Sequence, residues 1–244
     1  MSDAAPAIAT VDDARARANV WRLAIAQALT GANSAVIFAT GSIVGWMMEP
    51  DYATVPVSMY VLGLAAGTLP NGAISRRFGR RVAFLIGTGL GAVTGITGCV
   101  AILYNSFLLF CVATFVGGLY GAVSQSYRFA AADSASPAFR PKAVSLVLAG
   151  GVFAGLLGPQ LVQWTMTVWP QYLFAFSYLV QAAVALVAMA VVASVNAPRP
   201  PPADFHGGRP LLTIIRQPRF IGAALCGVII DPLMPYSPFS GDIA

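Results

Sequence analysis

The sequence predicts an all-α membrane protein built as a bundle of six transmembrane helices. Of its 244 residues, 57% are hydrophobic and only 9% are charged, whereas a soluble domain carries about 25% charged residues. Six long stretches contain no Asp, Glu, Lys, Arg or His. All fourteen Lys and Arg residues fall on one side of the membrane that these stretches would cross.

The six uncharged stretches are interpreted as six membrane-spanning helices. A helix needs roughly 20 residues to cross the hydrocarbon core, and each stretch has at least that length. Lipid cannot hydrogen-bond to backbone amides, and the stretches lack the alternation of polar and apolar residues that a membrane barrel shows. The predicted spans are residues 23–48, 53–75, 82–104, 107–127, 143–165 and 172–195.

The basic residues predict which way the helices run. They precede the first span, join the second to the third and the fourth to the fifth, and follow the sixth, while the opposite connections contain none. By the positive-inside rule both termini are then cytoplasmic, in a plasma membrane such as a bacterial inner membrane. This placement also explains the pI near 9.4, so no nucleic-acid partner is predicted.

The segments outside the bundle are expected to be a tail, a linker and an incomplete helix. Residues 1–22 form the cytoplasmic amino-terminal tail, and residues 196–219 form a basic, proline-rich cytoplasmic linker. Residues 220–244 begin a seventh apolar segment, but four residues interrupt it before it could span the membrane. They are Asp231, Pro232, Pro235 and Pro238. We therefore expect a truncated chain.

Two loop patterns identify the family that the chain resembles. The loop between the second and third spans resembles the signature of the major facilitator superfamily, with Arg76 in the place of the usual Asp. The matching residues are Gly72, Arg77, Gly79, Arg80 and Arg81. After the fourth span, Asp133, Pro137, Arg140 and Ala143 resemble a second family pattern. The resemblance implies the amino-terminal half of a transporter, built as 3+3 inverted repeats, with a carboxy-terminal half to complete it.

The two patterns together predict a gating loop. In the family the usual acid holds one conformation closed, and Arg76 cannot take that role alone. We expect Asp133 to substitute for it by pairing with Arg76 or Arg80, with Arg140 nearby. The alternative is that the arginines serve only to fix the topology, which explains their charge but not the spacing of Gly72 and Gly79.

The resemblance also predicts where solute binds, because the first, second, fourth and fifth helices of a family half line the central cavity. These helices hold six Asn and Gln residues against one, Gln181, in the other two. Amides are costly in lipid unless they are paired or face a cavity. The candidate substrate-binding residues are Gln27, Thr30, Asn33 and Ser34 on the first span and Tyr120, Ser124 and Gln125 on the fourth. Alternatively, these groups tie helices together.

The predicted function is secondary transport of a small solute by alternating access, with no cofactor, no metal and no catalytic residues. An intramembrane enzyme is disfavoured because the single histidine, His206, lies in the predicted linker. Two alternatives stay open. The chain could be a half-size carrier that pairs with a second copy, or a membrane subunit that does not transport.

Overall fold

The computed structural model describes residues 13–195, which form seven α-helices and one short 3-10 helix. The α-helices are α1 (Asp13–Met48), α2 (Val55–Phe78), α3 (Arg80–Leu103), α4 (Phe107–Ser124), α5 (Tyr127–Ser134), α6 (Arg140–Thr165) and α7 (Ala175–Ala193), and η1 (Pro50–Tyr52) is the 3-10 helix. The tail before residue 13, the linker and the incomplete seventh segment lie outside the described residues.

Six helical segments in this part of the chain are long and apolar enough to cross a membrane, which confirms the predicted fold class. α4 and the short α5 together make up one of them, Phe107–Ser134. Five of the six segments extend beyond the predicted spans, most of all α1, which begins at Asp13 within the predicted tail, and the fourth, which continues past residue 127. The others are α2, which ends at Phe78, and α3 and α6, which begin at Arg80 and Arg140. Helices extend beyond uncharged stretches because their polar ends can leave the lipid.

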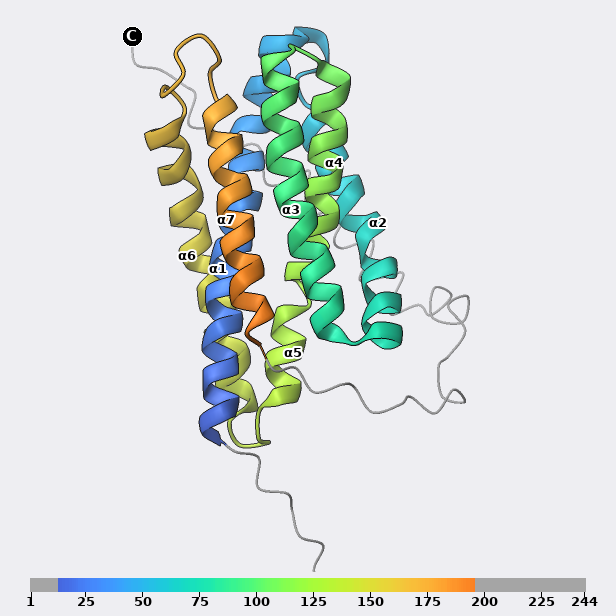
Figure 1. Cartoon of the computed structure of the whole chain (residues 1–244), viewed down its shortest axis with the longest axis vertical. Helices are drawn as coiled ribbons and strands as arrows, with labels where there is room; N and C mark the ends of the chain where they lie inside the picture. Colours follow the sequence, from blue (N-terminus) through green and yellow to red (C-terminus); the bar gives the residue numbers. More distant parts are fainter. Residues whose placement is uncertain (1–12, 196–244) are drawn as a thin grey trace, which may run out of the picture. The chain divides into compact units, whose positions relative to one another are not determined.

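In Figure 1, α1 lies beside α6 and α7, and α2 lies beside α3 and α4. The most extensive contacts join α1 to α6, α2 to α4 and α3 to α7, followed by α3 to α4 and α1 to α7. In inverted repeats the first, second and third spans correspond to the fourth, fifth and sixth, so α1 corresponds to α4, α2 to α6 and α3 to α7. The α1–α6 pair therefore corresponds to the α4–α2 pair. In the same way the α3–α4 pair corresponds to the α7–α1 pair. The helix contacts therefore follow the symmetry of inverted repeats.

Small residues let the paired helices approach closely. In the α1–α6 pair, a Cβ atom added to Gly31 would lie 2.6 Å from the Cβ of Ala154. In the α2–α4 pair, a Cβ added to Gly67 would lie 2.8 Å from the Cβ of Ala122. Membrane helices lack a hydrophobic force to drive their association and depend instead on such close packing. Matching glycine contacts in the two symmetry-related pairs hold the bundle together.

The interior consists of two apolar clusters with a polar layer between them. One cluster, near the arginine-rich end, includes Leu23, Phe84 and Val147. The other, near the opposite end, includes Phe110 and Tyr178. The buried polar residues Thr30 and Asn33 of α1, Tyr120 of α4 and Gln181 of α7 lie between the clusters along their helices. We call these four residues the polar layer, and it sits near the middle of the bundle.

Gly79 makes the sharp connection from α2 to α3, with φ 89° and ψ 158°. This conformation is open essentially to glycine alone. We expect Gly79→Ala to destabilise the fold by about 1–2 kcal/mol, because a Cβ atom is strained at positive φ. Thermal melting of the purified protein in detergent measures the change. Gly72→Ala is the matched control, since nothing lies within 4 Å of a Cβ added there; equal melting temperatures for the two variants would contradict the expectation.

Candidate functional site

The arginine-rich end of the bundle is held by contacts between loops and helix ends. Arg80, at the start of α3, forms an ion pair with Asp133 of α5. The structure therefore confirms that Asp133 pairs with one of its two predicted partners. Arg140 donates from Nε to the carbonyl of Ala132, 3.0 Å away, which fixes the turn after α5. Of the two predicted partners it is Arg80 that forms this ion pair, while Arg76 and its neighbour Arg77 are exposed at the end of α2.

Two further arginines at this end cap the last turn of α7. Arg81 donates to the carbonyl of Ala193 at 2.7 Å, and Arg22 donates to the carbonyl of Ser194 at 2.8 Å. The last carbonyls of a helix lack partners within the helix and carry partial negative charge, so cations stabilise them. Arg22, on α1, was not among the predicted gating residues. Arg22 and Ser194 are 172 positions apart in the sequence, so no sequence pattern predicts this contact.

The polar layer brings together predicted substrate-binding residues from the first and fourth spans. Thr30 and Asn33 are fully buried, and Tyr120 is 1% exposed with its hydroxyl beside both of them. Thr30 also lies beside the buried Tyr127 hydroxyl, so these side-chain oxygens lie close to one another, although their contacts fall short of strict hydrogen-bond geometry. An unused hydrogen-bonding group in a dry interior is costly. The polar layer therefore groups hydroxyls and an amide that can bond to one another or to a polar group of a solute.

Asn33 also ties two helices together, as the alternative interpretation allowed. Its amide donates to the backbone carbonyl of Gln181 at 3.1 Å, and the Gln181 amide donates back to the carbonyl of Asn33 at 3.4 Å. Gln181 is fully buried although it lies on a span expected to face lipid. The reciprocal pair joins α1 to α7 and leaves only the side-chain oxygens of both residues without partners among the described residues.

The other predicted substrate-binding residues are not part of the polar layer. Ser34 is half-buried, and its hydroxyl lies beside that of Tyr60 on α2. Gln27 is half-buried near the α6 backbone, where its Nε2 would be 3.7 Å from a Cβ added to Gly151. Ser124 donates to its own helix, and Gln125 is exposed. Tyr60, 3% exposed, is the residue that sequence reasoning missed.

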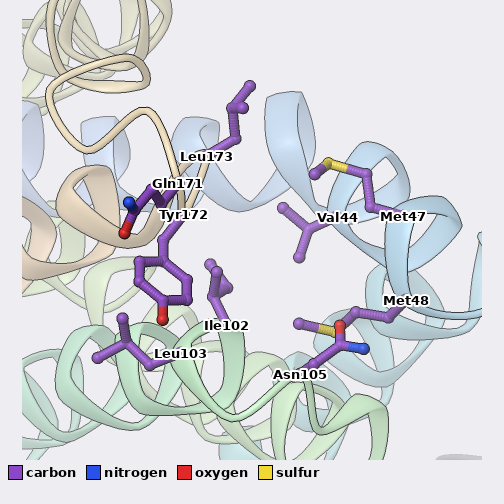
Figure 2. Close-up of a pocket in the computed structure, with 9 residues that line it drawn as sticks. All are labelled: Val44, Met47, Met48, Ile102, Leu103, Asn105, Gln171, Tyr172 and Leu173. Carbon is purple, nitrogen blue, oxygen red and sulfur yellow. The ribbon is translucent and has the colours of Figure 1, made fainter.

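A separate pocket of about 230 Å³ lies at the end of the bundle opposite the arginines. It is formed by the end of α1, the α3–α4 connection and the segment before α7 (Figure 2). Its nine lining residues are Val44, Met47, Met48, Ile102, Leu103, Asn105, Gln171, Tyr172 and Leu173, none of them charged. None of the predicted substrate-binding residues lines it.

The polar layer and the pocket share one chemical property, the lack of ionisable acids and bases other than tyrosine hydroxyls. The layer offers hydroxyls and amides, and the pocket offers thioethers, aliphatic walls, two amides and a phenol. Groups of this kind recognise an uncharged solute by hydrogen bonds and ring contacts. They provide no opposite charge to offset the desolvation of a charged solute.

A family model and several curated transporters match this chain. The family model of the Major Facilitator Superfamily matches residues 23–242. The riboflavin transporter RfnT of Brucella anthropi is 41% identical over 238 residues, 96% of this chain. Two uncharacterized MFS-type transporters of Bacillus subtilis, YdeG and YddS, are 29% and 33% identical, each over 57% of the chain. No solved structure matches the chain at a significant level.

The chain is shorter than these relatives. The matched regions cover 60% of the length of RfnT and 33% of the length of each Bacillus subtilis protein. The family model nevertheless covers most of the chain, and the six described spans pair as inverted repeats. This protein belongs to the Major Facilitator Superfamily.

Proposed function

We propose that this chain forms one six-helix half of an alternating-access carrier for an uncharged, planar, hydrogen-bonding solute, and that riboflavin is that solute. The observation that carries the proposal is the 41% identity to RfnT along nearly the whole chain. The uncharged character of the polar layer supports it, because riboflavin joins a neutral ring system to a hydroxyl-bearing chain. The chain acts as a carrier and not as an enzyme.

Solute contact is assigned to the polar layer and its nearest neighbours. Thr30, Asn33 and Tyr120 group their side-chain oxygens in the bundle centre, in loose contact with one another. Ser34 and Tyr60 lie beside them, and Ser34 is partly exposed. Substrate sites of such carriers lie near the bilayer midplane, between two repeats or halves. Solute arriving at Ser34 would meet hydroxyls already grouped on three helices.

Orientation and completion of the carrier are part of the same proposal. By the positive-inside rule, the arginine-rich end, with Arg22, Arg80 and Arg81, lies on the cytoplasmic side of the bacterial inner membrane. The second half of the pathway comes from a carboxy-terminal six-helix half or from a second copy of this chain. The length difference from RfnT supports the first of these.

Uptake of labelled riboflavin by a riboflavin-auxotrophic bacterium tests the proposal. The chain is expressed alone and together with the carboxy-terminal part of RfnT that follows its match to residues 23–195 of this chain. We expect uptake with the second half present, and Ser34→Ala and Tyr60→Phe to raise KM by about fivefold, the loss of one hydrogen bond. Ile96→Ala, on the exposed face of α3, is the control and should leave KM unchanged.

The same assay separates the alternatives. Uptake by the chain alone, with crosslinked dimers, would identify a half-size carrier that pairs with itself. Correctly inserted protein that takes up no riboflavin in either form, while copurifying with a soluble protein in fixed ratio, would contradict transport and identify a membrane subunit.

A further inference from the structure

The pocket at the end opposite the arginines is not explained by the polar layer. Its lining comes from three connected regions: Val44 and the two methionines after it on α1, the α3–α4 connection, and Gln171 to Leu173 before α7. We propose that this pocket is an outer binding site for the ring of a neutral aromatic solute, occupied before the solute reaches the polar layer. The inference rests on the proposed function and deepens it.

The walls of the pocket suit the flat face of a ring. Figure 2 shows Val44 and Met47 on one side of the pocket and Gln171 and Tyr172 on the other. Thioether groups contact aromatic rings favourably, and a tyrosine ring adds a stacking surface. The volume of about 230 Å³ is below the roughly 300–1,000 Å³ of pockets for drug-sized ligands. The pocket therefore accepts a ring system and leaves a longer polar chain outside.

The polar groups of the pocket are uncharged and few. Asn105 and Gln171 are exposed at its edge, and the Gln171 amide can bond to the polar edge of a heterocycle. Since no lining residue is charged, the pocket offers no ion pair to a phosphate or carboxylate. These features favour a neutral heterocycle over an anionic one.

Two residues with an uncommon backbone conformation lie in or next to the pocket lining. Within residues 13–195, the non-glycine residues with positive φ are Asn105, at 48°, and Phe174, at 67°. Asn105 lines the pocket, and Phe174 directly follows the lining residue Leu173 with its own side chain buried below in the apolar cluster. Asparagine adopts this conformation readily, whereas for a bulky residue such as Phe174 it is uncommon and persists only where the surrounding structure holds it, as at ligand sites.

Protection of single cysteines from a maleimide tests the pocket, with lumichrome, a neutral tricyclic ring lacking the hydroxyl-bearing chain, as the probe. Asn105→Cys and, separately, Thr54→Cys are made after Cys99, Cys111 and Cys226 are replaced by alanine. Thr54 is exposed at the same end outside the lining. At about ten times its Kd, lumichrome should slow labelling at position 105 about tenfold and leave position 54 unchanged.

The outcomes separate the pocket from the proposed function. Riboflavin uptake without protection at position 105 would overturn the pocket and leave transport intact. Protection by lumichrome without riboflavin uptake would support the pocket and remove riboflavin as the solute. Protection by a short-chain phosphatidylcholine and not by lumichrome would overturn the proposal in favour of a lipid site. Tyr172→Ala should abolish protection at position 105 while Thr54→Ala preserves it.

Discussion

Gly63→Ala is expected to abolish most of the correctly folded protein. A Cβ atom added to Gly63 on α2 would collide with the carbonyl oxygen of Phe115 and lie 3.1 Å from the Cα of Gly118 on α4. These are backbone atoms, so no side chain can rotate away. Overpacking typically costs 1–3 kcal/mol, and a collision with backbone should reach about 3 kcal/mol. The measurements are yield of monodisperse protein and thermal melting in detergent.

Gly89→Ala on α3 provides the matched control for Gly63→Ala. Nothing lies within 4 Å of a Cβ added to Gly89, and alanine favours a helix over glycine by about 0.8–1.0 kcal/mol. The control should therefore melt at the same temperature as the parent protein or slightly higher. If Gly63→Ala also melts at the parent temperature, α2 and α4 do not cross at these glycines.

The fold was predictable because lipid restricts what a spanning segment can contain. A charge at the bilayer centre is costly, so spans appear in the sequence as uncharged stretches, and helices are the only form those stretches can take. The ends were less predictable. Asp13 begins α1 within the predicted tail, and α5 carries the fourth span past Arg128, because a helix can continue into the aqueous phase where charge is tolerated.

The candidate site was only partly predictable, because helical spacing gives a face but not the helix that covers it. The pattern on the first span grouped Thr30 with Ser34, yet Thr30 is fully buried and Ser34 is half-buried. Asn33 finds its partner 148 positions away in Gln181. Tyr60 gave no signal, since a single tyrosine in an apolar span fits a purely structural role equally well.

The Arg80–Asp133 ion pair was predictable from the second loop pattern, and its exchange should separate function from stability. Arg80→Asp and Asp133→Arg, singly, should each reduce riboflavin uptake on the order of tenfold, because like charges then face each other and coupling between contacting residues reaches about 0.5–3 kcal/mol. The double variant restores opposite charges and should recover most of the uptake. The assay is that of the co-expressed halves.

Stability should change little in the same variants. The Arg80 and Asp133 side chains are 22% and 58% exposed, and exposed ion pairs contribute only about 0–1 kcal/mol. A loss of uptake with an unchanged melting temperature would therefore place the pair in the conformational cycle. Lys142→Asp makes the same charge change as Arg80→Asp at an exposed position in the first turn of α6. Two outcomes would contradict a gating role for the Arg80–Asp133 pair: a loss of uptake in Lys142→Asp as large as in Arg80→Asp, or a double variant that stays inactive. In either case the arginines serve only to set net charge and topology.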